Sequence, residues 1–141
     1  MQKVLIDAWG WLTLYDASER QHQTVKALYS KLLNSSARIY TTDFILDETF
    51  TLFFKRLNSY QAQHAVQTLY TALGSPPLSL ISIDSSLFAK TVDLRLKYAD
   101  KPRISFTDLS TMVVMQELGI QTIITEDAHF LQVGLGLECL P

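Results

Sequence analysis

Short β-prone runs alternate with helical patterns along this chain, and this order of elements constrains the fold more than any other feature. The β-prone runs cover residues 4–6, 38–41, 78–83 and 122–125. Apolar residues recur at helical spacing in the ranges 19–33, 43–57, 59–73, 84–98 and 105–118. No Asn-Gly hairpin signal separates the β-prone runs. The alternation therefore predicts an α/β fold with a mainly parallel central sheet and helices on both faces.

The composition favours one globular domain over residues 1–141. Hydrophobic residues make up 48% of the chain and charged residues 18%, which excludes an intrinsically disordered chain and a charge-rich coiled coil. We see no internal repeat and no linker. The longest apolar runs fall well short of the roughly 18 residues that a membrane span needs, so we expect no membrane-spanning segment.

The N-terminus and the cysteine content indicate a cytoplasmic protein. The first apolar run meets Asp7 too soon to form the apolar stretch of a signal peptide. The single cysteine, Cys139, excludes an internal disulfide and a cysteine-based zinc site. The net charge of −2 means that the whole molecule does not attract nucleic acid, although a small basic face is compatible with this total.

Four carboxylates stand where an α/β fold places its ligand sites. Asp7 directly follows the first β-prone run, Asp127 lies just beyond the last one, Asp108 is in the first turn of a helix, and Glu48 lies within a long helix. Ligands bind at the carboxyl ends of the strands in such sheets. Convergent acids raise one another's pKa, and a divalent cation removes this penalty. Ligands that are all oxygen favour Mg²⁺ or Mn²⁺ over zinc.

Each of these residues also has a structural interpretation. An aspartate after a strand or at a helix start is often only an N-cap, which stabilises the helix by about 1 kcal/mol. We interpret Asp43 and Asp84 in this way, and a glutamate in the middle of a helix, such as Glu48, is usually solvated. His129 follows Asp127 closely, but three scattered histidines do not have the spacing of zinc ligands. Packing or hydrogen bonding is the favoured role for His129.

Taken together, four segments resemble the PIN-domain family of ribonucleases, which includes the VapC-type toxins of bacterial toxin–antitoxin pairs. The segments are residues 4–7, 41–49, 105–108 and 124–130. The resemblance implies a PIN-like fold and a metal-dependent endoribonuclease that cleaves RNA phosphodiester bonds. It implies that Asp7, Glu48, Asp108 and Asp127 surround one or two Mg²⁺ or Mn²⁺ ions. It also implies an antitoxin protein as a possible partner.

Around the first and last acids, the chain both matches and departs from the family pattern. Thr125 matches the hydroxyl residue that commonly precedes the last acid by two positions. After Asp7, where the family often has Thr or Ser, this chain has Ala8 and then Trp9, which removes a hydroxyl group and narrows the site. Glu126 stands beside Asp127, and the Thr-x-Asp register favours Asp127 as the metal ligand.

The densest basic stretch precedes the Asp108 segment and offers a candidate RNA contact. It contains Arg95, Lys97, Lys101 and Arg103. Such a rim contacts RNA phosphates in one interpretation and is a solvated helix end followed by a loop in the other. Trp9, Trp11 and Tyr15 are candidates for base stacking, although core packing is the favoured role for at least two of them.

The helical patterns at 43–57 and 60–73 are unusually apolar for adjacent surface helices. Their large apolar residues are Phe44, Phe50, Phe53, Phe54, Leu57, Leu69, Tyr70 and Leu73. An exposed patch of this kind usually marks an interface. PIN-like proteins commonly pair through this region, as the resemblance implies, and we therefore predict a homodimer with two-fold symmetry.

The alternative from a different functional class is a non-catalytic α/β binding module, or a receiver-like module, whose acids only cap helices. A receiver-type phosphoacceptor site normally needs a lysine at the end of a late strand, and Ile124-Thr125 offers none. A third alternative keeps the PIN-like fold without catalysis and binds only RNA or a protein partner. The intact set of four acids argues against this third alternative.

Overall fold

The central element of the computed structural model, which describes residues 1–141, is a five-stranded parallel sheet. Its strands are β1 (Lys3–Ile6), β2 (Arg38–Thr42), β3 (Leu78–Ile81), β4 (Thr122–Ile124) and β5 (Glu138–Leu140). Their order in the sheet is β3-β2-β1-β4-β5, and all four neighbouring pairs are parallel. The predicted α/β class with a parallel sheet is confirmed.

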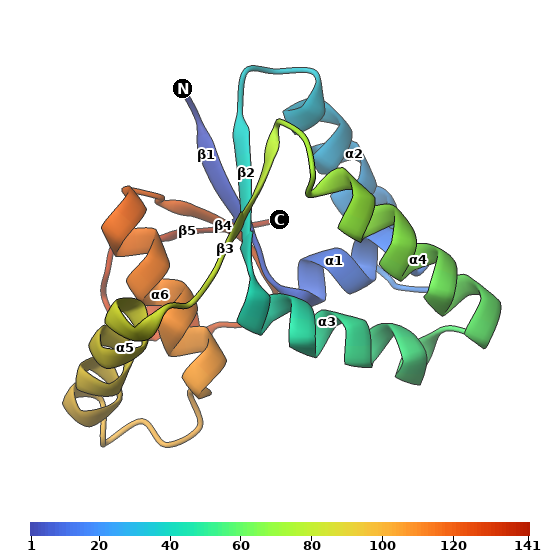
Figure 1. Ribbon diagram of the computed structural model, residues 1–141. Helices are drawn as coiled ribbons and strands as arrows, with labels where there is room; N and C mark the ends of the chain where they lie inside the picture. The colour runs from blue at the N-terminus through green and yellow to red at the C-terminus, as the bar shows by residue number, and fades with distance from the viewer.

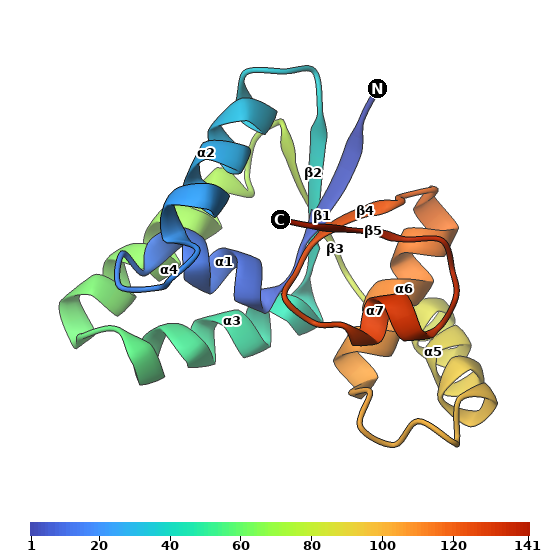
Figure 2. The same ribbon diagram turned by 180° about the vertical axis from the view of Figure 1, so that it is seen from behind.

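Seven helices flank this sheet in two groups. They are α1 (Ala8–Tyr15), α2 (His22–Leu33), α3 (Asp43–Arg56), α4 (Ser59–Ala72), α5 (Ser85–Lys97), α6 (Phe106–Leu118) and α7 (His129–Gln132). Figures 1 and 2 show α1 to α4 on one side of the sheet and α5 to α7 on the other. None of these helices has the length and apolar character needed to span a membrane.

Three elements were absent from the sequence prediction, which had four strands and no helix directly after Asp7. Helix α1 escapes detection because buried residues occupy almost every side of it, so its sequence has no amphipathic period. The strand β5 has three residues and α7 has four, too few to establish a period. The helix expected from residue 19 begins at His22, and the predicted strand 78–83 ends at Ile81.

Side-chain caps fix the starts of the helices that carry the predicted site residues. The Thr42 hydroxyl accepts a hydrogen bond from the Ile45 amide at the start of α3, and the Ser105 hydroxyl accepts one from the Asp108 amide at the start of α6, each at 3.0 Å. Gly119 ends α6 in the left-handed conformation at φ 67°, which glycine adopts without strain. Asp84 caps α5, as predicted.

The two apolar helices bury more of their side chains than the sequence suggested. Phe53 and Leu69 are fully buried in the core, so these two residues belong to no exposed patch. The large aromatic side chains that remain exposed are Phe54 (53%), Tyr60 (81%) and Tyr70 (67%). The predicted homodimer stays a prediction.

Helix α1 approaches the sheet more closely than a side chain at Gly10 would permit. A Cβ atom at Gly10 would lie 2.7 Å from Cγ2 of Ile6 and 3.1 Å from Cγ2 and the carbonyl oxygen of Ile124. These atoms belong to the ends of β1 and β4, which adjoin Asp7. The missing side chain therefore allows α1 to sit directly on the edge of the sheet.

We predict that Gly10→Ala destabilises the protein by about 1–3 kcal/mol, because the new methyl group overpacks a closed contact. Chemical denaturation followed by circular dichroism measures the change. Gly74→Ala is the matched control, because its Cβ would meet a single atom, the Thr71 carbonyl oxygen, at 3.3 Å. Equal stability of the Gly10 variant and the wild type would contradict the close approach.

Candidate active site

The predicted site residues converge where the chain reverses its direction across the sheet. From β1 the chain adds β2 and β3 on one side, and then crosses to add β4 and β5 on the other. Such a switch point opens a crevice at the carboxyl ends of the strands. Asp7 leaves β1 at this point, and the register pairs Ile6 with Ile124, which brings Thr125 beside Asp7.

Asp7 is the most deeply buried of the four predicted acids. One carboxylate oxygen accepts a hydrogen bond from the Gly10 amide at 3.0 Å, and the other accepts one from the Thr125 hydroxyl. Burial raises the pKa of Asp7 to about 7 against the lowering effect of these two hydrogen bonds, and the charges of Asp127 and Glu48 raise it further. Asp7 is both the N-cap of α1 and a member of the acidic group.

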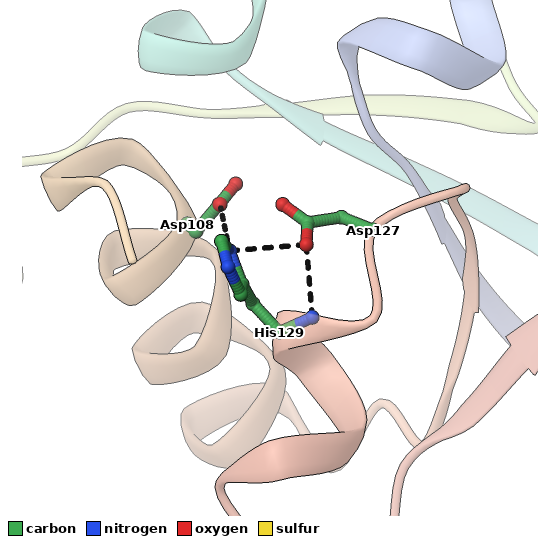
Figure 3. A group of neighbouring side chains, drawn as sticks. All are labelled: Asp108, Asp127 and His129. Carbon is green, nitrogen blue, oxygen red and sulfur yellow. Dashed lines mark hydrogen bonds and ion pairs between the residues drawn. The ribbon is translucent and has the colours of Figure 1, made fainter. Parts of the chain in front are cut away.

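Asp108 and Asp127 meet across the crevice with His129 between them (Figure 3). The His129 Nδ1 atom lies 3.0 Å from Oδ1 of Asp127 and 3.8 Å from Oδ2 of Asp108, although it is not aligned for a hydrogen bond. The His129 amide donates to the same Asp127 oxygen at 2.8 Å, and the Asp127 amide donates to the Thr125 hydroxyl at 2.9 Å. Burial and the neighbouring carboxylate of Asp127 raise the pKa of Asp108.

Glu48 lies at the exposed rim of the site, on α3. Partial burial and the charges of Asp127 and Asp47 raise the pKa of Glu48. The charges of Asp7 and Glu48 also contribute to the raised pKa of Asp108. The four predicted acids therefore act on one another electrostatically, as the sequence led us to expect.

No lysine or arginine pairs with any of these four acids. The ion pairs between basic and acidic side chains are Arg56–Glu19, Lys90–Glu117 and Lys101–Asp100, all elsewhere. Carboxylates gathered without a cationic partner have the charge and the oxygen donors that a divalent cation requires. The most compact possible ligand group consists of Asp108, Asp127 and His129, whose ligand atoms all lie within 4.8 Å of one another.

His129 is the residue whose position the sequence analysis undervalued. We assigned it to packing or hydrogen bonding, whereas its ring nitrogen faces two of the predicted acids. The short helix α7, which begins at His129, turns the ring toward α6. The one available sequence signal was its distance of two residues from Asp127.

The four basic residues that we expected near RNA have separate positions in the structure. The Arg95 guanidinium donates to the carbonyl oxygens of Tyr98 (2.8 Å), Lys101 (2.7 Å) and Ile104, so its donors serve the loop before α6. Lys97 lies beside Lys90 and Glu117 on the outer surface of α5. Lys101 and Arg103 line a hollow of about 370 Å³ together with His129. Of the four, these two share a hollow with His129, the neighbour of Asp108 and Asp127, and Lys101 also pairs with Asp100.

The sequence matches the family model of the PIN domain over residues 4–135. The chain belongs to the PIN domain family. No curated protein sequence matches this chain. The family resemblance that the sequence suggested is thereby confirmed.

Solved structures similar to this PIN domain share its fold over nearly the whole chain. VapC20 from Mycobacterium tuberculosis, described as a toxin that cleaves the sarcin-ricin loop, has a TM-score of 0.78 and 23% identity, over 93% of this chain and 95% of that one. VapBC2 from Rickettsia felis, bound to a DNA fragment from its promoter, has a TM-score of 0.69 and 16% identity, over 99% and 98%. PAE2754 from Pyrobaculum aerophilum has a TM-score of 0.67 and 14% identity, over 98% and 89%.

We predict that Arg95→Ala destabilises the protein by roughly 1.5–3 kcal/mol, because three carbonyl groups lose hydrogen bonds to a charged donor. Thermal denaturation measures the loss. Lys97→Ala is the matched control from the same helix and should stay close to the wild type. A neutral Arg95 variant would show that these bonds do not hold the loop before α6.

We also predict that the metal-free protein loses stability as pH rises. The folded protein raises the pKa of the Asp7 carboxyl to about 7, whereas the unfolded value is about 3.9. The stability that this group contributes is complete below the unfolded pKa and is lost as pH rises through the folded one. The melting temperature in a chelator should therefore fall between about pH 4 and pH 7, and Asp7→Asn should reduce that fall.

Asp84→Asn serves as the control for this titration, because Asp84 caps α5 outside the site. Added Mn²⁺ should raise the melting temperature more at the higher pH, since carboxylate ligands must be deprotonated. A melting temperature that follows the same pH course in the wild type and the Asp7 variant would contradict the assignment.

Proposed function

We propose that this PIN domain is a metal-dependent endoribonuclease that hydrolyses phosphodiester bonds in RNA. The observation that carries the proposal is the convergence of four carboxylates at the switch point of the sheet without any lysine or arginine as a partner. A group of this kind favours a hard divalent cation, Mg²⁺ or Mn²⁺, and a phosphodiester is a substrate that such a cation activates.

In this proposal Asp7, Asp108 and Asp127 hold the principal ion, and Glu48 completes the site or holds a second one. The ion would supply positive charge to the phosphate and lower the pKa of the attacking water. The Thr125 hydroxyl orients Asp7 through their hydrogen bond. The His129 ring nitrogen faces the carboxylate oxygens of Asp108 and Asp127, and it offers a further ligand to the ion.

The RNA backbone would enter from the hollow that Lys101 and Arg103 share with His129. Through His129 this hollow reaches the acids, and its cations would offset part of the repulsion between the acidic site and the phosphates. Arg95 has no part in this contact, because its donors are used by the loop.

The alternative of a binding module whose acids only cap helices accounts for Asp7 and Asp84. It does not account for Asp108, because Ser105 caps α6, and for Asp127 it accounts only for the oxygen that accepts the His129 amide at the start of α7. Capping also gives no reason for the two carboxylates to face each other across the crevice. A receiver-like module lacks its lysine, since Thr125 follows β4.

We further propose that the protein is the toxin of a toxin–antitoxin pair. The support is the fold that it shares with VapC20, with VapBC2, and with a toxin–antitoxin complex from Klebsiella pneumoniae (TM-score 0.63, 17% identity, over 98% of this chain and 96% of that one). A small upstream gene that encodes an antitoxin would support this pairing. A homodimer through α3 and α4 belongs to the same proposal, and its support is the exposure of Phe54, Tyr60 and Tyr70.

We predict that Asp108→Asn abolishes Mn²⁺-dependent RNA cleavage while the fold persists, because it removes a charged ligand without changing the volume of the side chain. Cleavage of labelled RNA measures the activity, and circular dichroism verifies the fold. Asp84→Asn is the control and should keep full activity, because Asp84 only caps α5. Full activity in the purified Asp108 variant would contradict the proposed role of Asp108 in cleavage.

A further inference from the structure

A second region of the surface adjoins Asp127 and shares no lining residue with the hollow that contains Lys101 and Arg103. A hollow of about 320 Å³ is lined by Asp127, Thr125, Trp9, Gln21 and Glu126, among others. A neighbouring hollow of about 270 Å³ is lined by Trp9, Gln21 and Glu126 again, together with Glu19 and Arg20. The three shared residues, Trp9, Gln21 and Glu126, thus stand at the junction of the two hollows; we call them the junction residues.

The two tryptophans of the chain have contrasting environments. Trp11 is fully buried, and its indole N–H donates to the Thr41 hydroxyl at 3.1 Å. Trp9 is only partly buried, and its indole N–H makes no hydrogen bond within the protein. Trp9 lies in the first turn of α1, two residues after Asp7, and lines the same hollow as Asp127. A partly exposed indole is a platform on which a base can stack.

The polar junction residues also have unused hydrogen-bonding capacity. Gln21 is the residue before α2, and its side chain does not cap the helix. Glu126 is exposed and forms no ion pair with any basic side chain. Arg20, in the second hollow, is likewise exposed and unpaired, so it offers a cation to a phosphate. A stacking surface with free polar groups at its edge is how proteins read single-stranded RNA.

The chemistry of Glu126 selects among the four bases. A carboxylate only accepts hydrogen bonds, and it does so with two oxygens. Guanine is the one base whose Watson–Crick edge presents two adjacent donors, N1–H and the N2 amino group. Cytosine and adenine each place an acceptor beside their amino group, and uracil places its single N–H between two carbonyls. The Gln21 amide has a donor for the guanine O6 acceptor.

We propose that the junction residues form a specificity pocket for an unpaired guanine base next to the scissile phosphate. Trp9 stacks on the base, Glu126 and Gln21 read its edge, and Arg20 contacts the backbone of the neighbouring nucleotide. The pocket adjoins the reacting atoms because Asp127 lines the same hollow. The inference rests on the proposed ribonuclease function for its role in cleavage, whereas recognition of the base can be measured alone.

The binding experiment uses the full chain with Asp108→Asn, in a chelator, so that no RNA is cut. The probes are short oligouridylates that carry one central guanosine, adenosine or cytidine, and one that contains uridine alone. We expect the guanosine probe to bind about tenfold more tightly than the others by anisotropy of a labelled RNA, a preference in the range of good edge contacts. Equal affinity for all four probes would overturn the pocket.

Variants then test the parts of Trp9 and Glu126, the first by intrinsic fluorescence. The guanosine probe should quench tryptophan emission, and Trp9→Phe should abolish the quenching, because the remaining Trp11 is buried. Quenching that persists in the Trp9 variant would overturn stacking at this position. Glu126→Gln should reduce the preference for guanosine, because an amide replaces one acceptor with a donor. Glu117→Gln, from the far end of α6, is the matched control, and an unchanged preference in the Glu126 variant would overturn its role.

Cleavage by the wild type with Mn²⁺ separates this proposal from the ribonuclease assignment. Cuts in an RNA of mixed sequence should lie beside unpaired guanosines, and Glu126→Gln should spread them over other bases. Cleavage without base preference, together with equal binding of the four probes, would contradict the guanine pocket and support the ribonuclease function. Guanosine-selective binding without cleavage of any RNA would contradict the ribonuclease function and support the guanine pocket.

Discussion

The buried carboxylate of Asp7 is the group on which the rest of the site depends. A carboxylate held away from water requires hydrogen-bond donors, and here they come from two different elements. The Gly10 amide comes from α1 and the Thr125 hydroxyl from the end of β4. To supply them, α1 must lie against the sheet, which only a residue without a side chain at position 10 permits, and β4 must pair with β1 in this register.

The cluster of four carboxylates lowers the stability of the folded protein. Asp7 and Asp108 have raised pKa values because burial and neighbouring carboxylates disfavour their charged forms. No lysine or arginine offsets this repulsion, although three ion pairs form elsewhere on the surface. Proteins keep such local conflicts at functional sites and compensate for them elsewhere. Here the fully buried strands around the site provide the compensation.

Two hollows near the acids are lined by chemically different side chains. The hollow that contains His129 also contains Lys101 and Arg103, whereas the hollow that contains Asp127 also contains Trp9, Gln21 and Glu126. Cations suit a phosphate, and an indole with free polar neighbours suits a base. On the proposed function, the hollow that reaches the acids through His129 takes the RNA backbone, and the hollow that Asp127 lines takes a nucleotide.

The sequence was sufficient for the features that local chemistry determines. Apolar runs and helical periods predicted four of the five strands and the helices from α2 to α6, because burial on a sheet and on a helix face leaves different periods. Thr42, Ser105 and Gly119 mark helix ends through their own side chains or backbone freedom. The acids at strand ends were visible because parallel strands place their carboxyl ends at one edge.

Only the tertiary structure decided which side chains meet. Helix α1 has no amphipathic period because it is buried on most sides, and β5 is a strand because β4 offers it a pairing edge. The sequence predicted Arg95 as an RNA contact, whereas in the structure its guanidinium donates hydrogen bonds to three carbonyl oxygens of the following loop. His129 faces two acids from a helix of only four residues. Partners distant in the sequence have no local signature, because their contact depends on how the packed elements bring them together.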